Sequence, residues 1–143
     1  MPELEYLVLA EYVRQDAGMT HIMGAGIDTF YVPAENLPVA FPAGVVARVT
    51  FDSRDEVGAE HEISLVFQGP DGQDILTASQ RFPVPPPPPG VPEHWRTAAS
   101  LITRLALLFP SHGNYRLQMT LDDDPRLSRS VDVRAIPPAP AQN

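Results

Sequence analysis

The stretch GNYRLQMTLDDDPRLSRSVDVRAI, residues Gly113 to Ile136, decides the fold class of this 143-residue chain. In its first half every second residue is apolar, which is the period-two pattern of a strand with one buried face. The run from Asp122 to Pro125 then breaks the alternation with turn-forming residues. The stretch therefore predicts a β-hairpin, whose apolar positions are Tyr115, Leu117, Met119 and Leu121 before the turn and Leu127, Val131, Val133 and Ala135 after it.

A hairpin alone is marginal in water, so its apolar face needs a second layer, and the rest of the chain offers more strands. Tyr6 to Val13 carries β-formers on both parities, which favours a strand covered on both faces, and Met19 to Met23 is expected to return antiparallel to it. Further predicted strands are Ile27–Val32, Val45–Phe51, Glu60–Gln68, Ile75–Phe82 and Ser100–Leu107.

About seven to eight short strands with turns between them predict an all-β fold with little or no helix. The architecture that fits is an antiparallel, immunoglobulin-like β-sandwich. Tyr115 follows a glycine corner and opens a late strand, as does the tyrosine of the tyrosine corner in immunoglobulin-like domains.

The connections between these strands contain most of the glycine and proline. Gly24-Ala25-Gly26 lacks the third glycine and the helix of a dinucleotide-binding loop, so a bend where the chain crosses between sheets is the preferred interpretation. Pro33 to Gly44 is expected to be an irregular crossover, and Asp52 to Gly58 a charged loop. Glu93 to Ala98 fits one helical turn before the strand Ser100–Leu107. The alternative is a longer helix in this segment, because Trp95, Ala98, Ala99, Ile102 and Ala106 also match a helical stripe.

One domain is predicted for residues 1–136, with an internal proline-rich connection at 83–92 and a disordered Pro/Ala-rich tail at 137–143. Five consecutive prolines, Pro85 to Pro89, favour the polyproline II conformation. This run is either a ligand for an SH3- or WW-type groove or a stiff spacer between the sheets. The spacer is preferred because no basic residue closely flanks the run.

Composition and charge narrow the classes of function. The chain has no cysteine and no lysine, which excludes thiolate or Schiff-base catalysis and a P-loop lysine. A net charge of −8 without a basic stripe argues against binding to nucleic acid or to an anionic membrane. The start of the sequence lacks the basic region of a signal peptide and no stretch is long enough for a transmembrane helix, so a cytoplasmic protein is expected.

The candidate metal site is the acidic turn Asp122, Asp123 and Asp124. Calcium takes six to eight oxygen ligands, so a second loop would have to contribute, either Asp52 with Asp55 or Asp71 with Asp74. The spacing matches no EF-hand, and aspartates that only form the turn are the more ordinary interpretation, so no cofactor is predicted.

Other reactive residues give weaker hypotheses. The histidines His21, His61, His94 and His112 show no metal-ligand spacing and are expected at the surface. Ser111 and His112 beside Asp122 supply the residue types of a catalytic triad but lack a nucleophile elbow. Trp95 is either an exposed anchor for a partner or a sugar, or a plug at the end of the core.

Three sequence features together resemble a family of uncharacterised bacterial proteins of similar length. These are the opening strand Leu7-Val8-Leu9-Ala10-Glu11, the glycine-rich second strand His21 to Gly26, and the corner Phe109-Pro110…Gly113-Asn114-Tyr115. The resemblance spans most of the chain and implies an all-β domain. It implies no activity and no functional residues.

These features favour a non-enzymatic interaction module that binds a protein partner, or a second copy of itself, through an edge strand or loops. The alternative is a small-ligand, carbohydrate or calcium-binding domain that uses the acidic loops. An enzyme is the least favoured class because no catalytic motif is present.

Overall fold

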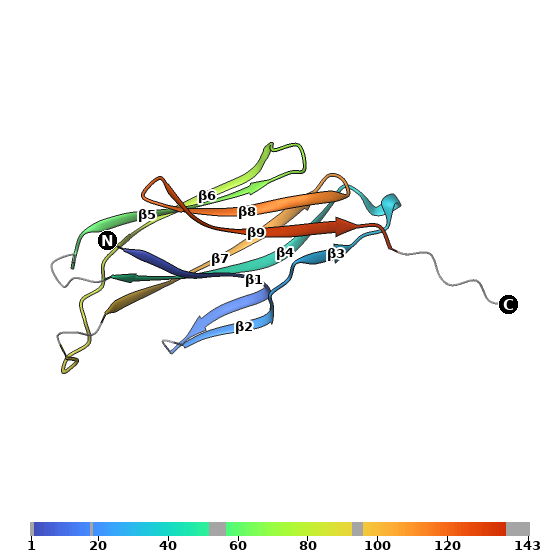
Figure 1. Cartoon of the computed structure of the whole chain (residues 1–143). Helices are drawn as coiled ribbons and strands as arrows, with labels where there is room; N and C mark the ends of the chain where they lie inside the picture. The colour runs from blue at the N-terminus through green and yellow to red at the C-terminus, as the bar shows by residue number, and fades with distance from the viewer. Residues whose placement is uncertain (1, 18, 52–56, 93–95, 137–143) are drawn as a thin grey trace.

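The computed structural model describes residues 2–17, 19–51, 57–92 and 96–136, and it is a β-sandwich (Figure 1). One sheet has four strands in the order β2-β1-β4-β7, and the other has five in the order β3-β9-β8-β5-β6. The strands of the first sheet are β1 (Glu3–Asp16), β2 (Met19–Ala25), β4 (Val39–Phe51) and β7 (Thr97–Phe109). Those of the second are β3 (Thr29–Tyr31), β5 (Glu60–Gln68), β6 (Asp74–Pro83), β8 (Gly113–Leu121) and β9 (Asp124–Arg134).

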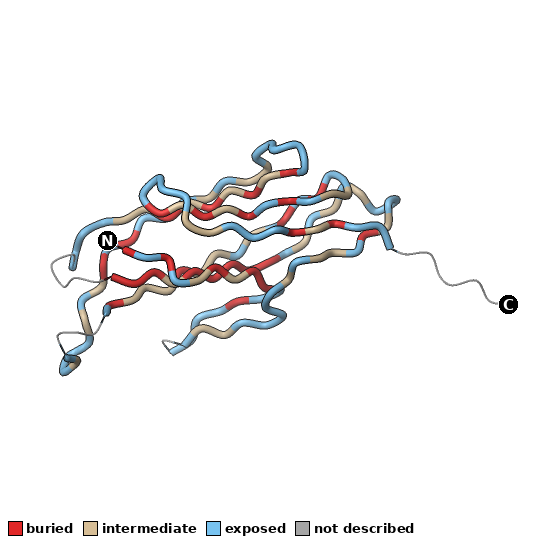
Figure 2. Tube along the Cα trace, viewed as in Figure 1, coloured by how far each residue is buried: buried red, intermediate tan, exposed pale blue. Residues whose placement is uncertain are grey.

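The predicted sandwich is confirmed, with nine described strands where about seven to eight were expected. A single 3-10 turn, Ala34–Asn36, is the only helical segment among the described residues. The strand pairs are antiparallel except for β3, which lies parallel to the end of β9. Figure 2 shows buried residues concentrated where the two sheets face each other.

The hairpin that decided the fold is formed by β8 and β9, and its alternating apolar residues enter the core. Tyr115, Leu117 and Leu121 are fully buried, and Val131 and Val133 lie beside them. Ala135 was expected on this face but is exposed, because β9 ends at Arg134.

Tyr115 fixes the corner that precedes the hairpin. Its hydroxyl donates to the Ser111 carbonyl oxygen at 2.7 Å and accepts the Ser111 N–H at 3.3 Å. Its ring stacks on Phe67 and meets Phe109 edge-on, with centroids 5.3 and 5.2 Å away. The predicted tyrosine-corner arrangement is therefore present.

β1 is covered on both faces over part of its length, because its second half bends over the first sheet, but Glu11 and Tyr12 within the predicted strand are exposed. Leu7 and Leu9 belong to the main core, whereas Ala10 and Val13 are buried with Val46 in a small second core on the outer face. Gly44 allows this: a Cβ at Gly44 would lie 2.4 Å from Val13 Cγ2. Residues 10–25, without the undescribed residue 18, are called the arm below; in Figure 1 the β1–β2 hairpin projects from the sandwich.

The expectation of an irregular crossover from Pro33 to Gly44 is wrong in its second half, because β4 already begins at Val39. Pro42 is tolerated inside this strand because β1 pairs with β4 only as far as Gly44, so β4 is locally an edge at Pro42. β7 begins at Thr97, so Thr97 and Ala98 are not part of a helical turn. Trp95 and His94 lie outside the described residues, as do Asp52, Asp55 and the tail 137–143.

Two predicted connections are confirmed as crossings between the sheets. The Gly24-to-Gly26 segment, with φ of 67° and 79° at its two glycines, leads from β2 in one sheet to β3 in the other. The proline-rich segment leads from β6 to β7, and its first residue after β6, Val84, is buried and bonded through its backbone to Ala59 and Gly58.

Candidate functional site

The acidic turn between β8 and β9 is tighter than expected. Leu121 pairs with Asp124, so the loop contains only Asp122 and Asp123, with φ of 51° and 63°. Positive φ at both central residues is typical of a type I′ hairpin turn, which favours Asn, Asp and Gly. Asp124 already belongs to β9 and forms an ion pair with Arg126 at 3.3 Å.

Asp122 is tied to the neighbouring strand β5. One carboxylate oxygen accepts the Glu62 N–H at 2.9 Å, and the other lies 2.6 Å from His61 Nδ1. The Asp122 N–H in turn donates to the Glu62 carbonyl oxygen at 2.8 Å. The Asp122 carboxylate thus takes the place of a backbone acceptor just beyond the end of the β5–β8 pairing and fixes the turn against β5.

His61 links this turn to the end of the core. Its ring packs against Phe51 and Phe82, with centroids 5.7 and 6.1 Å away, and those two rings are 6.1 Å apart. Its Nε2 is buried and has no hydrogen-bond partner among the described residues. Because a carboxylate only accepts hydrogen bonds, Nδ1 is the donor in its contact with Asp122.

The surroundings of Asp122 change the pKa of its carboxyl group. Burial raises that pKa, whereas the hydrogen bonds from the Glu62 N–H and from His61, with the charges of His61 and Arg126, lower it. The net pKa of Asp122 lies below its ordinary value. The carboxylate is therefore occupied as a structural acceptor.

The described residues do not bring Asp71 and Asp74 to the acidic turn. β5 runs antiparallel to β8, with Ile63 opposite Leu121 and Gln68 opposite Arg116. The loop that follows Gln68 therefore lies at the other end of the sheet. Within the described ranges, no group of three or more acidic or histidine side chains is placed to hold a metal ion.

The triad hypothesis fails for the same geometric reason. His112 and Asp122 flank opposite ends of the nine-residue strand β8, about 30 Å apart at 3.3 Å per residue. His112 Nε2 lies 2.7 Å from the Val32 carbonyl oxygen and holds the corner to the chain that follows β3. Asp122 is paired with His61, which the sequence did not single out as its partner.

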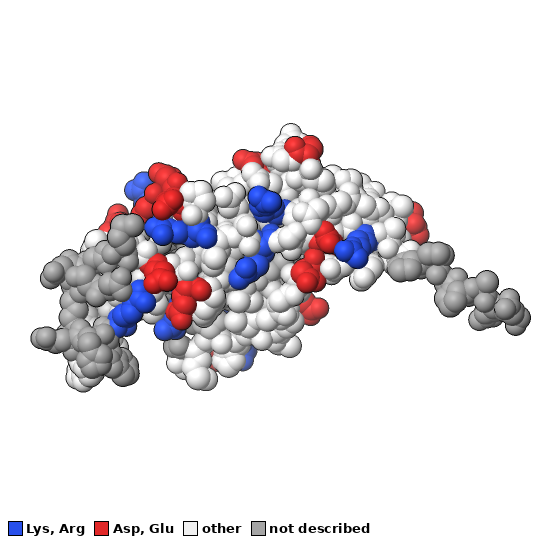
Figure 3. Space-filling model, in the orientation of Figure 1, with Lys and Arg blue, Asp and Glu red and all other residues white. Residues whose placement is uncertain are grey.

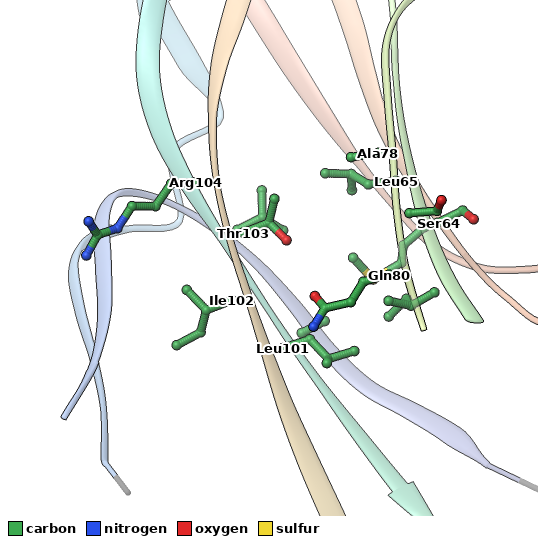
Figure 4. Close-up of a pocket in the computed structure, with 13 residues that line it drawn as sticks. Ser64, Leu65, Ala78, Gln80, Leu101, Ile102, Thr103 and Arg104 are labelled. Carbon is green, nitrogen blue, oxygen red and sulfur yellow. The ribbon is translucent and has the colours of Figure 1, made fainter. Parts of the chain in front are cut away.

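A second candidate lies on the side of the sandwich where β6 and β7, the last strands of their sheets, face each other. Here a cleft of about 420 Å³ reaches the core (Figure 4). It is called the side cleft below. Its floor includes Val45, Ala47, Leu65, Leu101 and Met119, and its rim includes Ser64, Ala78, Gln80 and Thr103.

The cleft exists because inward-facing positions at the two edges are small or polar. On β6 the inward positions Ala78 and Gln80 pair with Leu65 and Ile63 of β5. Figure 4 shows Thr103 directed toward the space between the sheets and Arg104 directed away from it. A polar residue at an inward position of the predicted strand Ile75–Phe82 was the sequence signal for this opening.

β7 presents a long edge beside the cleft. It spans thirteen residues and carries one charged side chain, Arg104. That side chain is directed to the arm, where Nε donates to the Val13 carbonyl oxygen at 3.1 Å and the guanidinium lies 4.8 Å from the centre of the Tyr12 ring. Arg104 is exposed but engaged with the arm, so the edge presents a single charge, whereas several exposed charges usually prevent an edge strand from pairing with another chain.

Comparison with known proteins identifies a family for this chain. A family model described as Family of unknown function (DUF6941) matches residues 5–134, nearly the whole sandwich. The chain belongs to this family. No curated protein and no solved structure matches the chain. Since membership carries no activity, the function has to be argued from the geometry.

The structure also bears on the membrane question. No helix in the described part of the chain is long and apolar enough to cross a membrane. On the face seen in Figure 3, acidic and arginine side chains lie next to one another. Many of them form ion pairs, such as Arg48 with Glu5 at 2.8 Å and Arg134 with Asp132 at 3.0 Å.

Proposed function

We propose that this protein is a non-enzymatic interaction module that binds an extended segment of a protein partner, or of a second copy, along the edge of β7. The observation that carries the proposal is the long, nearly uncharged edge of β7 beside a cleft that opens into the core. An added strand would pair its backbone with β7, and its alternate side chains would point toward the side cleft.

The opposing edge is a poorer template. β6 carries Asp74 and Arg81 and ends at Pro83, and the three consecutive residues Ser79 to Arg81 are exposed. Charges and proline are common devices that keep an edge from pairing. The proposal therefore assigns backbone pairing to β7 and only side-chain contacts to β6.

The experiment blocks the cleft without changing the edge. Ala78→Arg places a long charged side chain at the rim, whereas Thr77→Arg is the matched control on the same strand, with an exposed side chain at the neighbouring position. Tagged proteins are used to capture partners from extracts of the source cells, and light scattering gives the mass of each purified protein.

We expect wild type and Thr77→Arg to retain the same captured protein, or the same dimer mass, and Ala78→Arg to lose it while keeping its β-sheet circular dichroism spectrum. Equal retention by both variants would contradict a role for the side cleft. Equal loss in both would place the binding surface on the outer face of β6 instead.

A small apolar ligand is the second candidate for the same cleft. Its volume of about 420 Å³ falls within the usual range for ligand pockets. Native mass spectrometry of the purified protein distinguishes the two: a bound small molecule adds a discrete mass, and Ala78→Arg removes it.

A further inference from the structure

A different cleft lies on the opposite side of the sandwich, where the chain passes from β2 to β3. It has a volume of about 660 Å³ and lies between the base of the arm and the edge strand β3. We call it the crossover cleft. Its lining includes Glu11, Asp28, Phe30, Tyr31 and Phe41.

The aromatic wall of the crossover cleft is held by the core. The Phe30 ring lies 5.3 Å from that of Phe41 and 5.0 Å from that of Phe109, centre to centre. Phe109 is fully buried, so this wall has a fixed position. Tyr31, by contrast, is 56% exposed and offers its ring to solvent beside the wall.

Two carboxylates complete the cleft, and neither forms an ion pair with a described residue. Glu3, Glu5, Glu62, Asp122, Asp124 and Asp132 each lie within 4 Å of an arginine or histidine, whereas Glu11 and Asp28, like Glu35, do not. No arginine lines the crossover cleft. Arg129 lies along an adjoining cleft that Asp28 also borders, and its Nε donates to the Leu7 carbonyl oxygen at 3.2 Å.

The position of Glu11 depends on a glycine in the arm. A Cβ at Gly24 would lie 2.8 Å from Glu11 Cγ and 2.9 Å from Glu11 Cδ, so the absence of a side chain at Gly24 lets the Glu11 side chain lie across β2. Asp28 is held from the other side, where its carbonyl oxygen accepts the Asp132 N–H at 2.8 Å. Both acidic residues are thus placed by the fold.

We propose that the crossover cleft binds an arginine side chain from an extended segment of a protein partner. The carboxylates lack an ion-pair partner among the described residues, although Asp28 Oδ1 accepts a hydrogen bond from the Thr29 hydroxyl at 3.1 Å. An aromatic wall beside such carboxylates complements a cation with a flat apolar face. Guanidinium fits this description better than ammonium because it stacks on aromatic rings and donates two parallel hydrogen bonds to a carboxylate. The chain already contains one guanidinium–aromatic contact of this kind, between Arg104 and Tyr12, although that contact includes no carboxylate.

The inference is independent of the proposed function. The side cleft lies between β6 and β7, and the crossover cleft lies beside β2 and β3, at the other edges of the two sheets. Either site can be disproved while the other stands. If both bind, one partner segment along β7 and an arginine-bearing segment at the arm would hold the module from two sides.

The probe is a capped pentapeptide, acetyl-Gly-Ala-Arg-Ala-Gly-amide, compared with the same peptide containing citrulline, which keeps the shape but removes the charge. Binding is followed by amide chemical shifts in nuclear magnetic resonance at low salt. We expect saturable shifts around Asp28 and Tyr31 with a dissociation constant on the order of 1 mM, and at least about tenfold weaker binding of the citrulline peptide.

The double variant Glu11→Gln/Asp28→Asn tests the carboxylates. Its matched control is Glu60→Gln/Asp123→Asn, which removes the same charge from residues that line a cleft at the acidic turn. We expect the first variant to bind the arginine peptide at least about tenfold more weakly than wild type, and the control to bind it within about twofold of wild type. Both variants change the net charge equally, so a difference between them reports the specific carboxylates.

Several results would overturn the proposal. Equal affinity for the citrulline peptide, or equal weakening by both double variants, would show only nonspecific attraction to an acidic protein. Equal affinity for a lysine peptide would remove the preference for guanidinium. A dimer mass in light scattering with the crossover cleft protected in wild type would assign the cleft to a second copy.

Discussion

Tyr115 is the largest fully buried side chain of the described residues, and its hydroxyl forms the hydrogen bonds that fix a corner. Replacing it with alanine removes the stack on Phe67 and the contact with Phe109. We expect Tyr115→Ala to lower the free energy of unfolding by about 3 kcal/mol, since aromatic-to-alanine changes in cores cost about 3–5 kcal/mol and some repacking follows.

Tyr115→Phe separates the two contributions, because it keeps the ring and removes only the hydroxyl. It should cost about 1–2 kcal/mol, the usual value for lost buried hydrogen bonds. Urea unfolding followed by circular dichroism measures both variants. An unchanged midpoint for the alanine variant would show that Tyr115 is not part of the core.

Asp122 gives a prediction about pH. Its pKa is lowered in the folded protein, so its carboxylate stabilises the fold above the pKa of the unfolded chain, about 3.9, and this stabilisation is lost as the pH falls through the folded value. Asp122→Asn removes the ionisable group. We expect the loss of stability between pH 6 and pH 3 to be smaller in Asp122→Asn than in wild type.

The control for this measurement is Glu35→Gln, in the 3-10 turn, where the side chain is exposed and forms no ion pair with a described residue. Urea midpoints are compared at the two pH values. A wild-type slope in Asp122→Asn, or an equal change in Glu35→Gln, would argue that the bonds to His61 and Glu62 do not stabilise the folded state.

At the scale of elements, the bend of β1 depends on the contact between Val13 and Gly44. Gly44→Ala would push Val13 away from the outer face and disturb the bond from Arg104 to the Val13 carbonyl oxygen. We expect a loss of about 1–3 kcal/mol in the free energy of unfolding, which is typical of overpacking.

A double-mutant cycle tests the specific contact. Val13→Ala leaves room for the new methyl group, so Gly44→Ala should cost less in the Val13→Ala background than in wild type. Unfolding free energies of all four proteins give the coupling. Additive effects would mean that Gly44 is required for another reason than the packing of the arm.

The proline-rich element connects the sheets, and the structure places one anchor at its start, where Val84 is buried. If the five prolines are only a spacer, reducing the run to two should leave a folded protein with the same captured partner as wild type. Circular dichroism and a pull-down measure the two properties. A folded variant that has lost its partner would favour recognition of the polyproline II segment by a groove in that partner.

The sheet elements were predictable because their signals are local. Alternation in Glu60–Gln68 and in the last hairpin identified the strands and most of their buried residues, and turn residues separated them. The start of β4 at Val39 was missed because Pro42 argued against a strand there. Proline is allowed in a strand where the neighbouring strand is absent on one side, and the sequence does not show that β1 stops pairing with β4 at Gly44.

For the whole molecule, the candidate sites show the limits of reasoning from a single sequence. The partners of Asp122 are distant in sequence: His61 lies 61 residues away and Glu62 lies 60 residues away. No local sequence pattern therefore contains them. Gln80 did carry a signal, since it occupies an inward position of its strand. The crossover cleft carried none, because it joins residues from β1, β3 and β4 that only the folding of the arm brings together.

Binding of calcium at the acidic turn is the alternative that a thermal melt tests. A ligand that binds only the folded state raises the free energy of unfolding by RT ln(1 + [L]/Kd), so calcium at a hundred times Kd would add about 2.7 kcal/mol. Asp122 already accepts two hydrogen bonds, and Asp71 and Asp74 lie at the other end of the sheet. We therefore expect the melting temperature to be the same with and without millimolar calcium.

Light scattering on the same samples completes this experiment, because the mass separates the remaining possibilities. A dimer without a calcium shift would favour pairing of β7 with a second copy, whereas a monomer without a shift would favour a different protein as the partner of that edge. A clear shift that Asp123→Asn removes would instead establish an ion site at the turn. Because Asp124 is paired with Arg126 and Asp122 with His61, the other ligands of that ion would have to be groups other than these two carboxylates.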